Sequence, residues 1–284
     1  MKKAFIILAY KDPSQIEKLV TTLYHEKFDF YVHIDLKYDV QPFEYLSQLP
    51  NVFLVKDRYK MIWASYRFIE VLTTIIKTLL DKKCYDFISP FSGQDYPLKT
   101  AKEIYDYYNK NIGYSFISIE SENSEWYSEC KLRYEKYHFT YYSFKGLDFL
   151  SRLINKVFPK RKFPTYDKIY GGPRATWLTL STEAASYFVN TIEKEKSIRS
   201  FCKYTWAPDE FLIPTILMNS NFKHKIIFDS GRYIDWSEGG YNPKIFKTND
   251  FVSLANSGKL FARKFDIKID NEIYDLIDNK LLKK

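Results

Sequence analysis

The chain has 284 residues, of which 45% are hydrophobic and 27% are charged, and this ordinary globular usage excludes a disordered or collagen-like protein. The formal net charge is +8, which fits an anionic ligand, an anionic membrane surface or nucleic acid, and equally a plain solvated basic surface. Aromatic residues make up 19% of the chain, whereas glycine occurs only nine times, so a protein built on glycine-rich nucleotide loops is disfavoured.

The first hundred residues alternate between strand and helix patterns. The first of them, residues 4–10, is a continuous apolar run, which is typical of a central parallel strand that is covered on both faces. The expected elements are strands at 4–10, 28–35, 51–55 and 85–90, a helix after Asp12-Pro13, and a long helix from Ile62 to Leu80. This alternation predicts an α/β fold with a parallel sheet and crossover helices.

The second half of the chain is less regular. The expected elements are a strand at 113–120, a basic amphipathic stretch at 145–163, a turn and strand at 171–181, a helix at 208–218, a strand at 222–228, and loops with short helices at 229–266. No internal repeat, low-complexity tract or Gly/Ser/Pro linker interrupts this series. We therefore expect a single domain over residues 1–284.

Several kinds of site are excluded by missing motifs. There is no G-x-G-x-x-G, no Walker-type loop, no G-x-S-x-G and no H-E-x-x-H, and the four histidines are scattered. An Asp-x-Asp pair, which often holds a metal on a nucleotide diphosphate, is also absent, so no metal site is expected. Three widely spaced cysteines argue against a disulfide framework and indicate a reducing compartment. No segment approaches the ~20 apolar residues of a spanning helix.

Two groups of polar residues are candidates for binding a nucleotide. Asp35 ends an apolar strand, at the sheet edge where open α/β folds bind ligands, although a turn or helix-capping role is about as plausible. Arg263 and Lys264 lie between aromatic residues and could bind a diphosphate through two guanidinium donors and a compact ammonium. A basic pair of this kind is more often surface decoration.

Carboxylates near aromatic residues are candidates for work on a sugar. Asp209 and Glu210 open a predicted helix, where they either favour the helix dipole or hold a general base near a pocket. Glu120 follows a predicted strand and precedes Trp126 and Arg133, a mixture that suits sugar binding but also occurs in ordinary surfaces.

Taken in order, these segments resemble glycosyltransferase family 14, which contains the core-branching β-1,6-N-acetylglucosaminyltransferases and the peptide O-xylosyltransferases. The similarity covers nearly the whole chain. The matching segments are Ile7-Leu8-Ala9-Tyr10-Lys11-Asp12-Pro13, Val32-His33-Ile34-Asp35-Leu36-Lys37, Ile62-Trp63-Ala64-Ser65, Phe87-Ile88-Ser89-Pro90-Phe91-Ser92-Gly93-Gln94-Asp95-Tyr96-Pro97-Leu98-Lys99, Tyr170-Gly171-Gly172, Thr176-Trp177, Ala207-Pro208-Asp209-Glu210-Phe211, Asp235-Trp236 and Phe261-Ala262-Arg263-Lys264-Phe265.

The resemblance implies a single GT-A-type domain with a mixed, mainly parallel central sheet flanked by helices. Its nucleotide-binding half would cover about 1–115, and its acceptor and diphosphate-binding half about 116–284. It also implies a UDP-sugar donor, inversion at the anomeric carbon and no metal cofactor, which the missing Asp-x-Asp pair agrees with.

The resemblance also assigns roles to individual residues. Glu210 would be the catalytic base, and Asp209 would brace the start of its helix. The donor-binding residues would be Asp35, Ser65, Arg263 and Lys264, with Lys244 standing where branching enzymes carry an arginine, and the acceptor-binding residues would be Glu120, Trp177 and Trp236.

The function expected from the resemblance is transfer of a sugar, GlcNAc or xylose, from a UDP-sugar to a glycan or lipid-linked hydroxyl. We expect a bacterial, cytoplasmic enzyme of surface-polysaccharide synthesis. Residues 145–163, with an apolar side and a basic end, would contact the inner face of the membrane peripherally, and a buried core helix with a solvated end is about as plausible an interpretation. The alternative is a non-catalytic protein that binds polyanions or glycans. No nucleic-acid signature occurs, so no nucleic-acid partner is expected.

Overall fold

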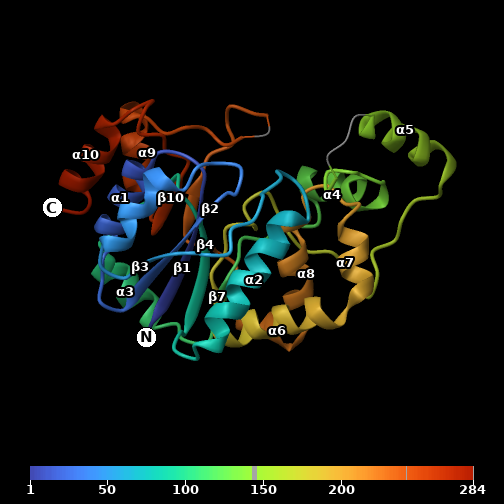
Figure 1. Ribbon diagram of the computed structural model, residues 1–284, viewed down its shortest axis with the longest axis horizontal. Helices are drawn as coiled ribbons and strands as arrows, with labels where there is room; N and C mark the ends of the chain where they lie inside the picture. The colour runs from blue at the N-terminus through green and yellow to red at the C-terminus, as the bar shows by residue number, and fades with distance from the viewer. Residues whose placement is uncertain (143–145, 241, 284) are drawn as a thin grey trace. The chain divides into compact units, whose positions relative to one another are not determined.

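The computed structural model describes residues 1–142, 146–240 and 242–283 (Figure 1). The chain forms two compact units, each assembled from segments that are distant in the sequence. Unit 1 contains Met1–Tyr59, Tyr85–Ile112 and Gly231–Lys284, and unit 2 contains Lys60–Cys84 and Gly113–Ser230. The division of labour between residues 1–115 and 116–284 stays a prediction, and the last part of the chain groups with the first.

Unit 1 is built on four parallel strands in the order β3-β2-β1-β4. Their bounds are Lys3–Ala9 for β1, Phe28–Ile34 for β2, Val52–Leu54 for β3 and Phe87–Ser92 for β4. All seven residues of β1 are buried, as expected for a strand between two parallel neighbours. The apolar runs of the first hundred residues therefore form the predicted parallel sheet.

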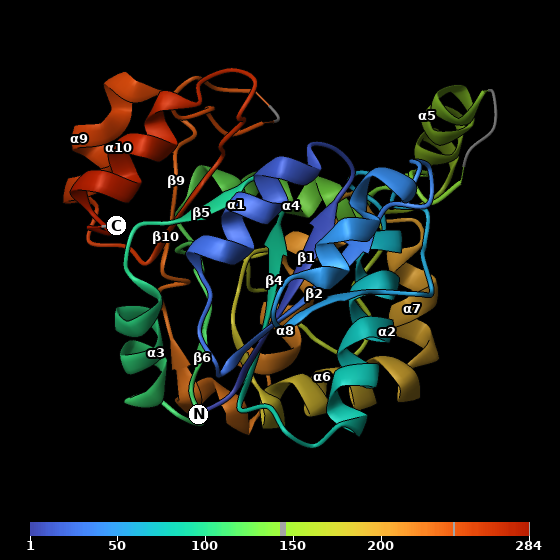
Figure 2. The same ribbon diagram turned by 60° about the vertical axis from the view of Figure 1, so that its left-hand side comes forward.

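Helices and a second, smaller sheet complete unit 1 (Figures 1 and 2). The helices are α1 (Pro13–Thr22), the 3-10 segment η1 (Gln41–Gln48), α3 (Ala101–Asn109), η4 (Thr248–Asp250), α9 (Phe251–Asn256) and α10 (Glu272–Lys280). The second sheet has the order β5-β10-β9, with β5 at Asp95–Pro97, β9 at Arg232–Ile234 and β10 at Phe261–Arg263. Strand β10 runs antiparallel to β5 and parallel to β9, so the sheets of the unit are mixed but mainly parallel.

Aromatic side chains fill the space between the two sheets of unit 1. The ring of Phe5 stacks on Phe30 at 5.3 Å between centroids and meets Phe91 edge-on at 5.0 Å. Phe261 of β10 meets Phe91 edge-on at 4.9 Å. The high aromatic content of the sequence is thus used in part for the core, where such pairs add to the free energy of burial.

Unit 2 is mostly helical. Its elements are α2 (Arg67–Asp81), β6 (Ser115–Phe116), α4 (Glu125–Glu135), α5 (Leu147–Val157), β7 (Leu180–Ser181), α6 (Thr182–Lys194), α7 (Lys196–Cys202), η2 (Pro208–Glu210), α8 (Leu212–Met218), η3 (Asn221–Lys225) and β8 (Ile226–Ile227). Strands β6 and β8 pair in parallel. Among the described residues no helix is long and apolar enough to cross a bilayer.

The expected α/β class with a mixed, mainly parallel sheet and flanking helices is confirmed, but several expected elements are shorter than predicted. Helix α2 begins at Arg67 rather than Ile62, because Ala64 adopts a left-handed conformation with φ of 54°. The expected strand at 113–120 is reduced to two residues. The expected strand at 222–228 begins as a 3-10 segment, where three consecutive polar residues, Lys223, His224 and Lys225, break the alternation that a strand needs.

Candidate functional site

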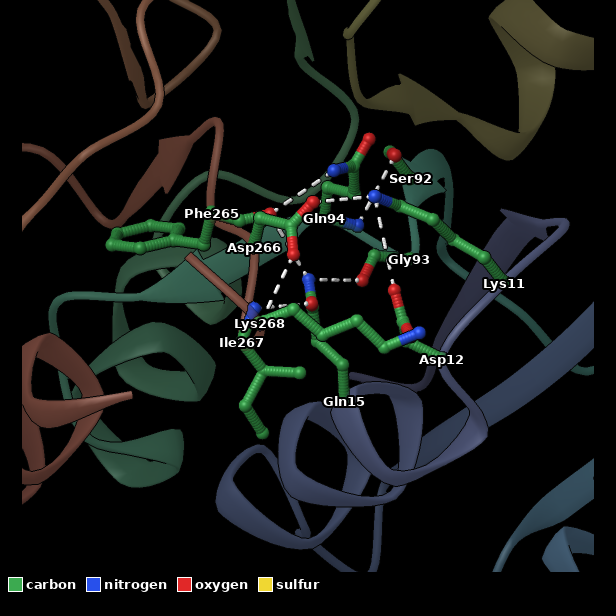
Figure 3. A network of polar contacts seen from close by, with 10 residues as sticks. All are labelled: Lys11, Asp12, Gln15, Ser92, Gly93, Gln94, Phe265, Asp266, Ile267 and Lys268. Atoms are coloured by element: carbon green, nitrogen blue, oxygen red, sulfur yellow. Dashed lines mark hydrogen bonds and ion pairs between the residues drawn. The ribbon is translucent and has the colours of Figure 1, made fainter. Parts of the chain in front are cut away.

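The carboxyl ends of β1 and β4 in unit 1 are tied to the C-terminal segment by two glutamines (Figure 3). The Gln15 side chain of α1 donates to the carbonyl of Gly93 at 2.9 Å and to that of Phe265 at 3.2 Å, and it accepts from the Ile267 N–H at 3.0 Å. Gln94 also donates to the Phe265 carbonyl, at 3.2 Å. Both glutamines are buried, so the segment that follows β10 is held firmly at this edge of the sheet.

Charged residues surround this junction (Figure 3). The Lys11 ammonium forms an ion pair and hydrogen bond with Asp266, and Lys268 pairs with Asp12 at 2.6 Å. The hydrogen bond and ion pair from Lys11 contribute to lowering the pKa of Asp266, against the effect of burial. A small hollow of about 10 Å³, room for about one water, lies between the ends of β1 and β4 and is lined in part by Lys11, Asp12 and Ser92.

Arg263 has a fully buried partner in unit 1. Its guanidinium donates to a carboxylate oxygen of Asp95 at 3.1 Å, and Arg232 approaches the second oxygen at 3.9 Å. The backbone N–H of Ser92 donates to that second oxygen at 3.2 Å. Burial raises the pKa of Asp95, and the two guanidinium groups oppose this rise. Part of the Arg263 charge is therefore used inside the protein.

Lys264 is the cation of this cluster that has no acidic partner. Among the residues that the structure describes, no carboxylate lies within ion-pair distance of its ammonium. Burial lowers the pKa of Lys264, and the positive charges of Arg263 and Lys11 lower it further, while Asp266 acts in the opposite sense. Three positive groups thus lie near one another at the sheet edge, a local excess that an anion would relieve.

Asp35 lies at the same edge, directly beyond β2. Its backbone N–H donates to the carbonyl of Ala9 at the end of β1, at 2.9 Å. Its buried carboxylate accepts from the Lys37 N–H at 3.0 Å and pairs with the Lys37 ammonium at 3.2 Å. Arg58 donates to its carbonyl at 3.1 Å. The position agrees with both interpretations of Asp35, since the residue shapes a turn and also lies at the edge where open α/β sheets generally bind ligands.

Lys244 and Trp236 follow β9 in unit 1. The Lys244 ammonium donates to Asp250 at 2.7 Å, so its charge is already paired. Trp236 is half-buried, and its indole N–H is buried with no hydrogen-bond partner among the described residues. The donor-binding role of Lys244 and the acceptor-binding role of Trp236 stay predictions.

In unit 2, Glu210 is held by two donors on one of its oxygens. The Trp126 indole N–H donates to Oε2 at 2.8 Å, and the Arg133 guanidinium forms an ion pair with the same atom. Oε1 has no hydrogen-bond partner in the described parts of the chain. Trp126 belongs to a small core with Cys130, Ile169 and Phe211. Because Trp126 and Arg133 both lie on helix α4, this helix fixes the position of the Glu210 carboxylate.

The neighbouring Asp209 points into the protein. It is half-buried, and its carboxylate accepts from the Thr176 hydroxyl at 2.9 Å. Burial, with a further contribution from the negative charge of Glu210, raises the pKa of Asp209 to about 7. The two adjacent carboxylates therefore differ in environment: Asp209 accepts a hydroxyl hydrogen bond and has a raised pKa, whereas Glu210 is ion-paired through one oxygen, and its other oxygen has no hydrogen-bond partner among the described residues.

Gly171 and Gly172 pass between the two glutamates that were expected to act on the acceptor. The Glu120 N–H donates to the Gly171 carbonyl at 2.8 Å, and the Gly172 N–H donates to the Glu210 carbonyl at 3.1 Å. A Cβ at Gly171 would lie 2.3 Å from the Glu210 carbonyl oxygen, and one at Gly172 would lie 2.8 Å from Cγ of Glu120. The Glu120 carboxylate itself accepts from Arg174 at 2.8 Å. Glycines here allow close approach of three backbone segments.

Ser65 and Trp177 also belong to unit 2. The buried Ser65 hydroxyl donates to the Ile62 carbonyl at 3.0 Å and accepts from the Arg67 N–H at 3.2 Å, so it shapes the entry to α2. Trp177 meets Phe68 edge-on, with 6.1 Å between ring centroids. Ser65 and Asp35 fall in different units.

Sequence reasoning missed the partners that orient the candidate groups. Trp126 and Arg133 stood out as a sugar-binding mixture, whereas in the structure they hold Glu210 across 84 and 77 residues. Lys11 and Asp95 lay inside the matched segments without an assigned role. Arg232 carried no sequence signal at all.

Comparison with known proteins identifies the family. A model of the family described as "Branch: Core-2/I-Branching enzyme" matches residues 3–256. Xylosyltransferase 2 of Rattus norvegicus is 24% identical over 293 residues, which cover 93% of this chain and 32% of the relative. Xylosyltransferase of Ciona intestinalis is 23% identical over 297 residues, covering 94% and 32%. The chain thus spans about a third of the length of the curated relatives it matches.

Among solved structures, mouse xyloside xylosyltransferase 1 in its apo form aligns with a TM-score of 0.40 and 9% identity, covering 92% of this chain and 97% of that one. Because the family model matches well over half of the sequence, the chain belongs to the Core-2/I-branching enzyme family of glycosyltransferases.

Proposed function

We propose that this chain is an inverting, metal-independent glycosyltransferase that moves a sugar from a UDP-sugar to a hydroxyl of a glycan or glycolipid. The observation that carries the proposal is the excess of positive charge at the carboxyl edge of the unit 1 sheet. There, Lys264 has no acidic partner in the described residues and lies close to Arg263 and Lys11. A diphosphate is the kind of anion that such a cluster binds.

In this proposal the diphosphate of the donor is bound by Arg263 and Lys264, and Asp35 contacts the uridine. During transfer the bond between the anomeric carbon and the diphosphate oxygen breaks, and its electron pair stays on the diphosphate. Lys264 and Arg263 offset the negative charge that grows there, which is usually the largest electrostatic contribution to catalysis. Lys244 is less suited to this role, because its charge is already paired with Asp250.

Glu210 is proposed as the general base. An acceptor hydroxyl forms the new bond to the anomeric carbon from the opposite face and gives its proton to the carboxylate. Arg133 and Trp126 bind Oε2, so they fix the side chain while Oε1 accepts the proton. Glu120, Trp177 and Trp236 are proposed to contact the acceptor.

The compartment is proposed to be the cytoplasm, and the pathway to be bacterial surface-polysaccharide synthesis. The three cysteines support a reducing environment, since all of them are free and Cys84 is exposed. GlcNAc and xylose are both retained, because the family description names branching enzymes and the curated relatives are xylosyltransferases.

The experiment is a donor-hydrolysis screen across UDP-sugars in the presence of EDTA. We expect hydrolysis of one donor at the same rate with and without EDTA, and we expect UDP to protect the protein against thermal unfolding. Turnover that vanishes in EDTA and returns with manganese would contradict metal independence. Absence of both hydrolysis and UDP protection would favour the non-catalytic alternative.

A further inference from the structure

Helix α5 in unit 2, drawn in Figures 1 and 2, makes its side-chain hydrogen bonds to the protein through polar residues. Asn155 accepts from the Tyr137 N–H at 2.7 Å and donates to the Tyr137 carbonyl at 2.9 Å, and Ser151 donates to the same carbonyl at 2.7 Å. Polar residues of an amphipathic surface helix normally face water and its apolar residues face the core. Here the polar residues Ser151 and Asn155 form hydrogen bonds with the backbone of Tyr137.

Part of the apolar surface of α5 faces solvent, while Leu150 and Ile154 are half-buried. Phe149 is 69% exposed, Leu153 48% and Val157 71%. These residues are four apart and form one stripe, and at about 100° per residue Leu153 lies roughly opposite the pair Ser151 and Asn155. Phe158, directly after the helix, is also more than half exposed. A stripe of large apolar side chains on this scale is costly in water unless it has a binding partner.

Basic residues border this stripe. Residues 146–163 contain five basic side chains and one acidic side chain. Arg152 and Lys156 are exposed and precede Leu153 and Val157 by one position each, so they lie along one margin of the stripe. Lys160 pairs with Glu135 at 2.9 Å but stays largely exposed, and Lys162 is exposed.

Arg161 differs from its neighbours. Its guanidinium donates to the carbonyls of Tyr204 and Phe201 and lies over the Phe201 ring at 3.7 Å. The expected basic end at residues 160–162 is therefore divided: Arg161 anchors the segment to the protein, and Lys160 and Lys162 remain at the surface. Residue 145, where the expected stretch begins, lies outside the described residues.

We propose that α5 is a docking element for an anionic lipid bilayer, lying in the plane of the interface with Phe149, Leu153 and Val157 inserted and Lys156 at the headgroups. Apolar anchors next to lysine and arginine are the combination that binds such a surface, because insertion and attraction to anionic headgroups act together. A second copy of this chain is the poorer occupant, since two faces with the same basic margin would repel each other. The inference does not depend on the proposed glycosyl transfer.

The test is co-sedimentation of the full chain with vesicles of phosphatidylcholine, with and without phosphatidylglycerol. We expect binding to the anionic vesicles only, weakened by salt. The double variant Phe149→Gln/Leu153→Gln should lower the partition coefficient by roughly tenfold or more, since each inserted CH₂ contributes about 0.8 kcal/mol. Lys156→Glu should lower it by roughly fivefold or more, at about 1 kcal/mol per basic residue before the charge reversal is counted.

Matched controls lie elsewhere on the surface. Val252→Gln/Ile269→Gln removes two comparably exposed apolar residues from unit 1, and Lys194→Glu reverses an exposed charge in unit 2. Both should bind like the parent chain. Equal binding of all variants, or equal binding to neutral vesicles, would overturn the proposal. A parent chain that is dimeric in sedimentation velocity and becomes monomeric in the α5 double variant would also overturn it. Unchanged thermal unfolding of the α5 variants excludes misfolding as the cause.

Discussion

The two units handle buried charge in opposite ways. In unit 1 a buried carboxylate, Asp95, is approached by two guanidinium groups, and the cation left over is Lys264. In unit 2 two adjacent carboxylates, Asp209 and Glu210, lie near one guanidinium, that of Arg133, which forms its ion pair with Glu210. Asp209 is left to the Thr176 hydroxyl and keeps a raised pKa.

The difference shows which charge each unit has available for a ligand. Unit 1 has a surplus cation, which suits binding of an anion, and unit 2 has a surplus carboxylate oxygen, which suits removal of a proton. The ion pairs Arg263–Asp95 in unit 1 and Arg133–Glu210 in unit 2 hold the neighbouring charged side chains in position. Substitutions that alter only the surplus group should therefore change function and leave stability intact, and substitutions of the supporting groups should do the reverse.

The strongest test of this distinction is Glu210→Gln. The amide keeps the shape and the hydrogen bond from Trp126 but cannot accept the acceptor proton. We expect transfer to fall by roughly 10²–10⁴-fold, with UDP binding near that of the parent chain. Product formation followed by mass spectrometry measures the effect. Glu193→Gln, which removes an exposed charge paired with Lys77 in the same unit, is the matched control and should leave transfer unchanged. If transfer by the Glu210 variant is near normal, the base lies elsewhere and Glu120 is the next candidate.

A second test acts on the support of Glu210 and not on its charge. A Cβ at Gly171 would lie 2.3 Å from the Glu210 carbonyl oxygen, 2.7 Å from the Trp126 ring and 2.8 Å from Cα of Phe211. Two of these atoms are backbone and cannot yield, so Gly171→Ala should cost about 3 kcal/mol or more. Gly172→Ala should cost less, because the nearest contact is the flexible Glu120 side chain. Equal unfolding free energies for the two variants would disprove this packing argument.

How far these groups could be predicted from the sequence depends on the range of the contacts. Strands β1, β2 and β4 were predictable, since each is a local apolar run. Asp209 and Glu210 were both candidates from their place in the sequence, and the resemblance alone selected Glu210. The residues that orient Glu210 come from a helix about eighty positions earlier, and no spacing rule relates them. Asp95 and Arg263, 168 residues apart, meet only because β5 and β10 pair. Periodicity reports local structure, and long-range ion pairs follow from tertiary packing.

Asp209 provides a pH test of the unit 2 arrangement. Its pKa is raised to about 7 in the folded protein, mainly by burial, so between about pH 4 and pH 7 the folded state binds more protons than the unfolded state. The sign is then fixed: this residue lowers the stability as pH rises, by about 2 kcal/mol from pH 5 to pH 7. The side chain of Asp209→Asn cannot titrate, so this variant should lack that part of the pH dependence of the unfolding free energy. Urea unfolding at several pH values measures it. An unchanged slope would show that Asp209 ionises freely.

The smallest expected effect concerns the surplus cation of unit 1. Lys264→Met keeps the length and apolar stem of the side chain and removes the charge. We expect the affinity for UDP, measured by calorimetry in EDTA, to fall about tenfold, and less at high salt. Thermal stability without ligand should stay the same or rise, since the ammonium faces the like charges of Arg263 and Lys11. Lys268→Met removes an exposed ammonium that pairs with Asp12 and should leave the affinity for UDP unchanged.

The two measurements separate a structural role of Lys264 from a ligand-binding role. Substitution of a structural lysine would lower the thermal stability of the protein, whereas substitution of a ligand-binding lysine would lower its affinity for UDP. A Lys264 variant that is less stable but binds UDP normally would place the anion site elsewhere, and Lys244→Met would then test the other lysine that is proposed to bind the donor.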